Sequence, residues 1–410
     1  MNILLINHYA GSPSLGMEFR PYYMAREWLK MGNQTRIVGA SFSHLRKQQP
    51  VKRKEVIDGI SYSWIKTNCY HGNGIGRILS MFQFIVKLLF GYKRLLRDFI
   101  PDAVIASSTY PLDNYVAYRI ARHYGAKMVY EIHDLWPLSP MELGGYSPRH
   151  PFIRVMQRAE DFAYRHCDAV VCMLPKAAEH CVAHGLPAEK FYYVPNGIVL
   201  EDWEKPESLP SEHQQLIENL KQGGKFLVGF AGAHGIANSL QAAIEAASTL
   251  KDKNIDFVLV GTGQEKENLI RFTREQEITN VHFLPPVSKF AIPSFLREMD
   301  ALYIGLQKQS LFRFGISPNK LFDYMMAEKP VIQAIDAGNN IVREADCGLD
   351  VEPDNVAEIA GAMEKLSRLP EEELHRMGDN GKKFVLENHT YSILAKRFID
   401  CLEKIITLSR

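Results

Sequence analysis

Residues 2–32, NILLINHYAGSPSLGMEFRPYYMAREWLKMG, start with an apolar run, pass through a loop that contains glycines, and become amphipathic from Glu18 onward. The segment closes at Gly32, and glycine is the residue that most often ends a helix. Residues 225–250, KFLVGFAGAHGIANSLQAAIEAASTL, show the same order of patterns near the middle of the chain. Each stretch therefore predicts a strand, a glycine-bearing loop and a helix, the opening elements of an α/β domain.

Short apolar segments follow both of these starts, and helical patterns separate them. They are TRIVGA, DAVIASS, KMVYEIH and DAVVCML in the first half, and DFVLVG, VHFLP, ALYIGL and PVIQAI in the second. Strands that alternate with helices predict parallel sheets covered on both faces. The polar residues 201–224 separate the halves. We expect two Rossmann-like domains, 1–204 and 205–390, that face each other across a cleft, and a C-terminal helix, 391–410, that packs back on the first domain.

Composition narrows the function only slightly. The chain is 46% hydrophobic and 23% charged, which is typical of a soluble globular protein. Its six cysteines form no CxxC pair, so we expect reduced thiols and a cytoplasmic location. The N-terminus has no basic segment before an apolar one, which argues against a signal peptide. The motifs DxD, HExxH, GxSxG and GxxxxGK[ST] are absent from the sequence, and we therefore expect no catalytic metal and no other cofactor.

Charge is distributed unevenly along the chain. The net charge is +1, but residues 1–200 carry 24 Lys and Arg against 15 Asp and Glu, whereas residues 201–410 carry 24 against 32. We expect the first half to attract an anionic surface or ligand, and we expect no nucleic acid partner. Ordinary scatter of charge between two domains is the alternative.

Residues 75–100, IGRILSMFQFIVKLLFGYKRLLRDFI, are the most apolar segment, although Lys87 interrupts it. Apolar side chains recur there at helical spacing, at Ile75, Leu79, Phe82, Val86 and Leu89. Five basic residues accompany one acid, Asp98. The pattern suits a helix that lies on an anionic membrane, which would place the protein on the inner face of the plasma membrane. It suits a helix packed in the core equally well, and both interpretations stay open here.

Residues 314–332, FGISPNKLFDYMMAEKPVI, contain the most informative polar pattern. Ser317 is a favourable N-cap and Pro318 suits the first helical position, so we expect a helix that continues from Lys320. The N-terminus of such a helix attracts anions, and Lys320 adds a positive charge there. Asp323 lies one turn behind, so a nucleotide diphosphate would fit with its phosphates at the helix tip and its ribose on Asp323. An ordinary Ser-Pro helix start with a solvated Lys and Asp is the alternative.

The segment SPNKLFDYM, followed by KPVI, resembles the donor-site signature of retaining glycosyltransferases of family four, which have the GT-B fold. The resemblance is strongest to bacterial O-antigen and capsule enzymes such as N-acetylfucosaminyltransferases. Further segments match in order along the chain: YEIHDLWP, VPNGI, GFAGAHG, LVGTGQEKENL and VHFLPPVSK. The resemblance implies a nucleotide-sugar donor and a lipid-diphosphate-linked saccharide acceptor in the synthesis of a bacterial surface polysaccharide.

By this resemblance, Asp323 binds the ribose, and the loop before it binds the pyrophosphate and the sugar. The loop residues are Gly315, Ile316, Ser317, Pro318 and Asn319. Many members have Glu where this chain has Gly315, so sugar recognition must differ here.

Many members also have Arg and Lys at the positions of Ala233 and Asn238. The positive charge on the phosphates must then come from another residue. Lys320 is the first candidate, and we also expect it to be catalytic, while Arg313 is the second candidate.

In the first domain, His133 closes the strand KMVYEIH, and a polar side chain at the carboxyl end of a parallel strand faces the ligand side of the sheet. By resemblance, His133 contacts the transferred sugar, and we expect His133 and the neighbouring Glu131 to be catalytic. A histidine satisfied in the core is the alternative. Gly16 ends the loop after the first strand, where it would approach the diphosphate or simply form a turn.

The second domain has a glycine-bearing loop of its own after each of its first two strands. Gly232 lies in the first loop, and Gly261 and Gly263 lie in the second. The GxG lacks the third glycine of a dinucleotide fingerprint. The family places this turn beside the nucleoside, with Val287 near the base.

Together these patterns predict a retaining, metal-independent glycosyltransferase that moves a hexosyl or N-acetylhexosaminyl group from a UDP-sugar to a lipid-linked saccharide. Two alternatives remain open: an enzyme that resembles UDP-N-acetylglucosamine 2-epimerase, and a sugar-nucleotide-binding protein without catalysis. Gly315, Ala233 and Asn238 are the residues that favour the last alternative, because they depart from the family's pattern.

Overall fold

The computed structural model describes residues 1–16, 19–72 and 74–407. The chain forms two compact units, one of residues 1–196 with 391–410 and the other of residues 197–390. The expected boundary at 204/205 is therefore eight residues too late. Ile198 and Trp203 are buried in the core of the second unit, and Ile198 forms a parallel bridge with Thr390. These contacts hold residues 197–204 on the second unit.

The first unit contains an eight-stranded sheet in the order β3-β4-β2-β1-β5-β6-β7-β8. Its strands are β1 (Asn2–Ile6), β2 (Gln34–Ala40), β3 (Lys54–Ile57), β4 (Ile60–Ile65), β5 (Ala103–Ala106), β6 (Lys127–Ile132), β7 (Ala169–Cys172) and β8 (Phe191–Tyr193). Its helices are α1 (Phe19–Lys30), α2 (Ile75–Leu95), α3 (Asp113–Tyr124), α4 (Leu138–Glu142), α5 (Pro151–His166), α6 (Ala178–Ala183) and α16 (Tyr391–Thr407). The expected helix start at Glu18 lies outside the described residues.

One strand of this sheet departs from the expected parallel arrangement. β3 pairs antiparallel with β4, and Asp58 and Gly59 between them both have positive φ. An Asp-Gly pair with two positive φ angles is the preferred two-residue turn of a β-hairpin. The edge strand is therefore a local hairpin that needs no crossover helix.

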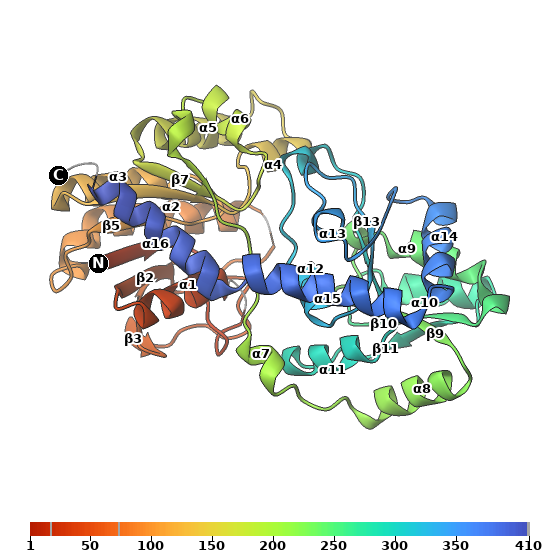
Figure 1. Cartoon of the computed structure of the whole chain (residues 1–410). Helices are drawn as coiled ribbons and strands as arrows, with labels where there is room; N and C mark the ends of the chain where they lie inside the picture. Colours follow the sequence, from red (N-terminus) through yellow and green to blue (C-terminus); the bar gives the residue numbers. More distant parts are fainter. Residues whose placement is uncertain (17–18, 73, 408–410) are drawn as a thin grey trace. The chain divides into compact units, whose positions relative to one another are not determined.

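The strand order decides which helices cover which face of the first sheet. It reverses direction at β1, so right-handed crossovers place α1 on one face and α2, α3 and α5 on the other. The C-terminal helix α16 lies along α1 (Figure 1). Trp28 of α1 is fully buried, its ring meets Phe398 at 5.1 Å, and its Nε1 donates to the carbonyl of Ala395. The last helix thus completes the core of the first unit.

The second unit contains a six-stranded, fully parallel sheet in the order β11-β10-β9-β12-β13-β14. Its strands are β9 (Phe226–Ala231), β10 (Ile255–Val260), β11 (Val281–Leu284), β12 (Ala301–Gly305), β13 (Val331–Ala334) and β14 (Gly348–Val351). Its helices are α7 (Glu201–Glu204), α8 (Ser211–Gln222), α9 (Leu240–Ser248), α10 (Lys266–Glu275), α11 (Ile292–Arg297), α12 (Asn319–Met326), α13 (Ile341–Glu344), α14 (Val356–Ser367) and α15 (Glu371–Asn388). The polar segment that was expected to separate the domains contains α7 and α8.

Side chains alternate across the second sheet as its pleat requires. Leu227, Val258 and Leu302 point into one core cluster, with α11 and α12. Val228, Phe257 and Tyr303 point into the other, with α9 and α14. The two units thus have the same architecture, a mostly or wholly parallel sheet between two helical layers, and the Rossmann-like prediction is confirmed for both.

Candidate functional site

The loops after β9 and β10 touch each other at the carboxyl edge of the second sheet. A Cβ atom at Gly261 would lie 1.9 Å from the carbonyl oxygen of Gly232, and one at Gly263 would lie 2.3 Å from that of His234. Gly261 also has φ +146°. No side chain larger than hydrogen fits at either position, so the glycines that sequence analysis assigned to the donor first serve to bring two backbones together.

Lys320 reaches these glycines from the first turn of α12. Its Nζ would lie 3.3 Å from a Cβ at Gly232, donates to Oδ1 of Asn238, and sits 4.6 Å from the centre of the Phe230 ring. Burial lowers the pKa of Lys320 to about 8. Desolvation is the sole cause of this shift, and among the described residues no carboxylate forms an ion pair with Lys320. Partial burial of an ammonium without a counter-charge is unfavourable, and a bound anion would offset that cost.

Asn238 occupies a position at which many members of the resembled family have a basic residue, and it contacts Lys320. Its Oδ1 accepts from Lys320 and its Nδ2 donates to the carbonyl of Ala233. Asn238 therefore holds the Lys320 ammonium beside the glycine loops. The Lys320 ammonium therefore lies next to one of the two positions at which many members of the resembled family have a basic residue.

The N-terminus of α12 differs from the expected one by a residue. Pro318 takes the N-cap position with extended backbone and no side-chain cap, and the helix begins at Asn319. Ser317 lies before the cap, because the Pro318 ring favours an extended conformation in the residue that precedes it. The N–H of Leu321 donates to the carbonyl of Pro318, so the N–H groups of Asn319 and Lys320 are the first-turn donors that a bound acceptor could use.

The loop before α12 is held by a neighbouring loop that sequence analysis did not identify. Asn339 accepts from the backbone N–H of Ile316 and donates to its carbonyl. Gly315 adopts φ +94°, a conformation that strongly favours glycine. Arg313, the second candidate cation, is exposed; its guanidinium donates to the carbonyl of Ser310 and lies 4.3 Å from the Phe314 ring centre.

Asp323 lies one turn along α12 and is half-buried. Burial raises its pKa to about 7, although Lys289 and a hydrogen bond with Trp203 oppose this effect. Val287, which was expected near the base, packs against the core cluster on the α12 side of the sheet.

His234 lies in the same loop cluster and sequence analysis did not single it out. It is fully buried, and neither ring nitrogen has a hydrogen-bond partner among the described residues. Burial, followed by the charges of Lys266 and Lys320, lowers its pKa to about 4. The neutral ring packs between Phe230 and Phe283. Its role in this structure is to fill the space beneath the glycine loops.

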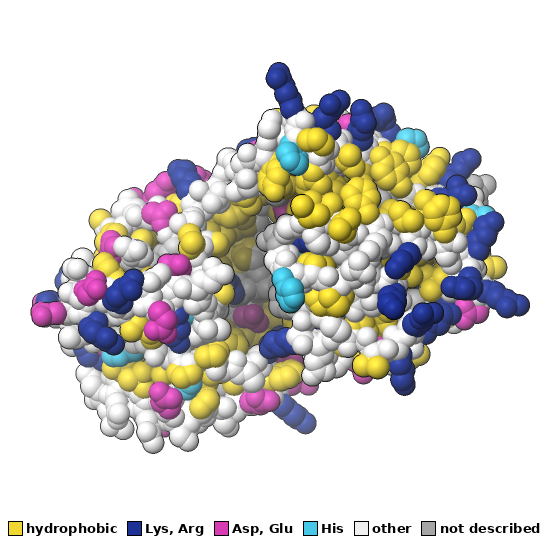
Figure 2. Space-filling view, turned by 180° about the vertical axis from the view of Figure 1, so that it is seen from behind, with side chains coloured by type: hydrophobic (Ala, Val, Ile, Leu, Met, Phe, Trp, Pro, Cys, Tyr) yellow, Lys and Arg dark blue, Asp and Glu magenta, His cyan; other side chains and the backbone are white. Residues whose placement is uncertain are grey.

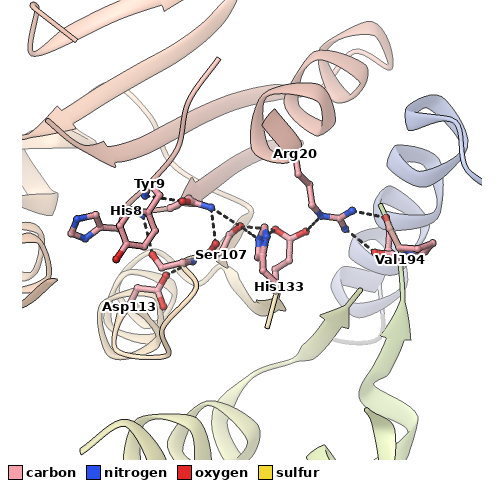
Figure 3. A network of polar contacts seen from close by, with 11 residues as sticks. His8, Tyr9, Arg20, Ser107, Asp113, His133 and Val194 are labelled. Atoms are coloured by element: carbon pink, nitrogen blue, oxygen red, sulfur yellow. Dashed lines mark hydrogen bonds and ion pairs between the residues drawn. The ribbon is translucent and has the colours of Figure 1, made fainter. Parts of the chain in front are cut away.

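In the first unit, His133 belongs to a continuous polar network at the carboxyl ends of three strands (Figure 3). Ser107, after β5, donates to Oε2 of Glu131 at 2.7 Å, and its Oγ lies 2.9 Å from Nε2 of His133. Because the hydroxyl gives its one hydrogen to Glu131, it accepts from His133, which places a hydrogen on Nε2. Asn7, after β1, donates to the carbonyl of Ser107 at 2.7 Å.

Glu131 is buried and is held by Arg20 of α1. The Nε of Arg20 lies 2.9 Å from Oε1 of Glu131, and its other nitrogens donate to the carbonyls of Val194 and Pro195. Burial alone raises the pKa of Glu131, but Arg20, His133 and Ser107 together hold it at about 2. Both oxygens of Glu131 thus have partners, and Ser107 links the carboxylate to His133.

Two further buried groups lie beneath this network. His8 contacts the Tyr110 hydroxyl at 2.6 Å, and burial together with Arg46 and Arg77 lowers its pKa to about 3. Asp113 accepts from the backbone N–H of Ser108, and burial raises its pKa to about 7.

Gly16, which was expected to approach the diphosphate or to form a turn, has φ +79°, and its N–H donates to the carbonyl of Ser12. These two observations describe a turn.

Sequence analysis identified His133 and Glu131 but missed Arg20, Ser107 and Asn7. Asn7 and Ser107 each follow a strand directly, so the rule that selected His133 also applies to them. Arg20 offers no such signal, because its partner lies 111 residues away.

Comparison with known proteins agrees with this architecture. Residues 16–202 match Glycosyltransferase Family 4, and residues 212–384 match Glycosyl transferases group 1. A probable glycosyltransferase of Pseudomonas aeruginosa, WbjE, is 20% identical over 344 residues, 82% of each chain. A putative colanic acid biosynthesis glycosyl transferase of Escherichia coli, WcaI, is 22% identical over 61% of this chain and 62% of the relative.

Solved structures share the fold. Sucrose-phosphate synthase from Thermosynechococcus elongatus superimposes with a TM-score of 0.75 at 13% identity over 99% of both chains. Anabaena HepE in complex with UDP-glucose superimposes with a TM-score of 0.66 at 14% identity, over 98% of this chain and 100% of that one. The protein is a glycosyltransferase with the GT-B fold. The Family 4 match ends six residues beyond the first segment of the first unit, and the group 1 match lies within the second unit.

The Arg20–Glu131 pair yields a stability prediction. Arg20→Met leaves a buried carboxylate without its counter-charge, and we expect the free energy of unfolding to fall by about 3–5 kcal/mol. Arg20→Met combined with Glu131→Met removes both charges and should recover much of that loss. Urea unfolding of the wild type, both single variants and the double variant measures the coupling. Additive effects of the two substitutions would contradict the assignment.

Proposed function

We propose that the protein is a retaining, metal-independent glycosyltransferase that moves a hexosyl or N-acetylhexosaminyl group from a UDP-sugar to a lipid-diphosphate-linked saccharide. The observation that carries this proposal is the Lys320 ammonium, half-buried beside Gly232 without a carboxylate partner among the described residues. A nucleoside diphosphate supplies the charge that is missing there. The uncapped N-terminus of α12 supplies N–H donors to the same group.

The reaction needs the leaving diphosphate to be stabilised as the bond to the sugar breaks. Fixed donors at the position where charge develops are the most effective means in a desolvated site. Lys320 and the first-turn N–H groups of α12 provide such donors, and Asp323 would accept from the ribose hydroxyls. His133 would contact the transferred sugar, with Ser107 and Glu131 fixing its tautomer.

The names of relatives support bacterial polysaccharide synthesis as the pathway. WcaI is named for colanic acid biosynthesis, and TuaH of Bacillus subtilis, 26% identical over 50% of each chain, is named for teichuronic acid biosynthesis. HepE has been solved with UDP-glucose. We infer a UDP-sugar donor and a surface-polysaccharide acceptor from these names, and N-acetylated sugars belong in the donor screen because of the sequence resemblance.

The test is incubation with a panel of UDP-sugars, with and without a lipid-diphosphate-linked saccharide, in buffer that contains a chelator. We expect UDP release that requires the acceptor, with the anomeric configuration of the donor retained in the product. Conversion of the donor alone would instead indicate an epimerase. UDP-sugar binding without turnover on any acceptor would indicate a binding protein.

The two ionisable groups of α12 predict how UDP affinity depends on pH. Lys320, with a pKa of about 8, loses its charge above that pH, whereas Asp323, with a pKa of about 7, gains its charge above that value. Affinity for UDP should therefore be greatest between about pH 7 and 8.

Lys320→Met should abolish the fall in UDP affinity at alkaline pH and lower kcat/KM by about one to two orders of magnitude. Asp323→Asn should weaken UDP binding near neutrality and reduce the acid decline.

Calorimetry with UDP from pH 6 to pH 9.5 measures the fall in UDP affinity on both the acid and the alkaline side. Lys308→Met, which removes an exposed lysine paired with Asp336 and Glu352, is the matched control and should change neither. An alkaline decline that persists in folded Lys320→Met would show that Lys320 does not bind the diphosphate. Unchanged UDP affinity in Asp323→Asn would make that carboxylate structural.

We further propose that helix α2 places the protein on an anionic membrane, where a lipid-linked acceptor would lie. One face of α2 is buried in the first unit, at Ser80, Met81, Phe84, Ile85, Leu88 and Tyr92. The other face exposes a row of apolar side chains, at Ile75, Leu79, Phe82, Val86 and Phe90. The two interpretations of this segment thus each describe one side of the helix.

The apolar row has basic neighbours. Figure 2 shows hydrophobic side chains gathered on the first unit, with Lys and Arg side chains nearby. A groove along α2 is lined by Val86 and Phe90 and by five basic residues, Arg53, Lys54, Lys66, Lys87 and Arg94. Among the described residues, α2 is the only helix long and apolar enough to cross a membrane by length and composition, and 28% of its most apolar window is buried. Its exposed face and basic rim favour an interfacial position.

Changing Lys93, Arg94 and Arg97 together to Gln should weaken binding to anionic vesicles by roughly two orders of magnitude, at about 1 kcal/mol per residue. Phe90→Ser should weaken it as well, since Phe90 is 84% exposed. Vesicle flotation at low and high salt measures both effects. The matched control changes three exposed lysines of the second unit, Lys251, Lys365 and Lys383, to Gln. No flotation of the wild type, or equal loss in the control, would refute the membrane role.

A further inference from the structure

Two histidines and two carboxylates converge between α5 and α6, away from the strand ends that form the candidate site. His180 and His184 are four residues apart, so they share one side of α6 and its C-cap. Glu160 and Asp161 face them from α5, which lies beside α6 in Figure 1. Nε2 of His180 is 3.1 Å from Oε1 of Glu160, and Nδ1 of His184 is 3.0 Å from Oδ1 of Asp161.

The spacing of these atoms fits the coordination of a metal ion. Glu160, His180 and His184 each offer one ligand atom, and these three atoms lie within 4.8 Å of one another. A tetrahedral ion with ligands at about 2.0–2.1 Å separates them by about 3.3–3.4 Å. The His180–Glu160 distance is already close to that value, and His184 is only half-buried, so rotation of its side chain can bring the third ligand in.

The charges of the cluster also favour a cation. Glu160 is 1% exposed, and a buried carboxylate is costly without a positive partner. Two carboxylates lie here, and the guanidinium of Arg165 approaches only Asp161, at 3.8 Å. A divalent ion would balance both carboxylates.

Neighbouring side chains prepare the ligands in the way that metal sites require. The Tyr164 hydroxyl donates to Oε1 of Glu160 at 2.8 Å and fixes its orientation. The amide nitrogen of Gln157 lies within 3.0 Å of three atoms, Oε2 of Glu160, Oδ1 of Asp161 and Nδ1 of His184. The two hydrogens of the amide go to the two carboxylates, and Nδ1 of His184 carries the hydrogen that it shares with Asp161. In a neutral His184 ring the lone pair is then on Nε2, and Asp161 fixes this tautomer.

We propose that Glu160, His180 and His184 form a zinc site that links α5 to α6, with Asp161 or water at the fourth position. Imidazole and carboxylate ligands without cysteine suit Zn²⁺, and three protein ligands leave one position open. The site belongs to the first unit alone and is independent of the proposed transfer reaction. Its role is structural, because the metal would tie the short α6 to the longer α5.

The experiment uses tag-free full-length protein that has been stripped with a chelator and titrated with ZnCl₂ by calorimetry. We expect one Zn²⁺ per chain with micromolar or tighter affinity, and a rise in Tm of roughly 5 °C at saturating metal. Titration with Co²⁺ should give the visible absorption of a four- or five-coordinate ion. Absence of stoichiometric Zn²⁺ binding would overturn the proposal.

Conservative variants assign the ligands. His184→Asn places an amide near the position of Nδ1, and His180→Gln places one near that of Nε2, so both keep hydrogen bonding while they remove a ligand. Each should weaken Zn²⁺ binding more than about tenfold. The control is His375→Asn, because His375 also lies four residues from a carboxylate, Glu371, but in an exposed pair 3.7 Å apart. It should bind as the wild type does.

Circular dichroism and unfolding in chelator confirm that each variant is folded before metal is added. If the His180→Gln and His184→Asn double variant does not fold, His184→Asn alone decides, since its ring is the more exposed of the two. Zn²⁺ affinity in a folded variant equal to that of the wild type would place the metal elsewhere and refute the site.

Discussion

Parallel pairing of the strands is the constraint on which the candidate site residues of each unit depend. Since β9 and β10 run side by side in register from Phe226↔Ile255 to Ala231↔Val260, their loops leave from the same edge of the sheet. The backbones then come so close that Gly261 and Gly263 cannot carry a side chain. The same constraint sets Asn7, Ser107 and His133 at adjacent strand ends of the first unit. The polar groups are therefore assembled by topology before any ligand is considered.

The candidate site residues of the two units differ in how buried charge is compensated. In the first unit, the Glu131 carboxylate is fully compensated, by Arg20 on one oxygen and by Ser107 on the other. In the second unit, Lys320 has an amide oxygen and an aromatic ring as neighbours, and desolvation alone shifts its pKa. A compensated network holds a side chain still, whereas an uncompensated charge favours binding of its opposite. The first arrangement suits orientation of His133, and the second suits capture of an anion.

Hydrophobic periodicity was sufficient to predict the two α/β units. The strand-end rule placed His133 directly after β6, and the helix-start pattern placed Lys320 in the first turn of α12, while the roles of both residues stay predictions. The same local patterns could not find every polar partner. They failed where the deciding contact is distant in sequence. Arg20 and Glu131 are 111 residues apart, and His180 and Glu160 belong to two different helices. No local sequence motif therefore predicts either of these two pairs. The hairpin of β3 and β4 was missed for another reason, because its Asp-Gly turn is a local signal that was not used. The boundary was misplaced because Ile198 and Trp203, which precede the expected boundary, are buried in the core of the second unit.

Helix α2 shows why periodicity alone could not choose between a core helix and a surface helix. Its apolar residues occupy two opposite faces, and the stripe at Ile75, Leu79, Phe82 and Val86 is the one that the fold leaves exposed. Burial of Met81, Phe84 and Leu88 already accounts for the position of α2 in the first unit. The exposed stripe therefore adds nothing to the core, and a large apolar surface beside basic residues usually marks an interaction site. Residues 1–196 and 391–410, which form the first unit, carry 28 Lys and Arg against 17 Asp and Glu, so the whole unit has the same preference for an anionic partner.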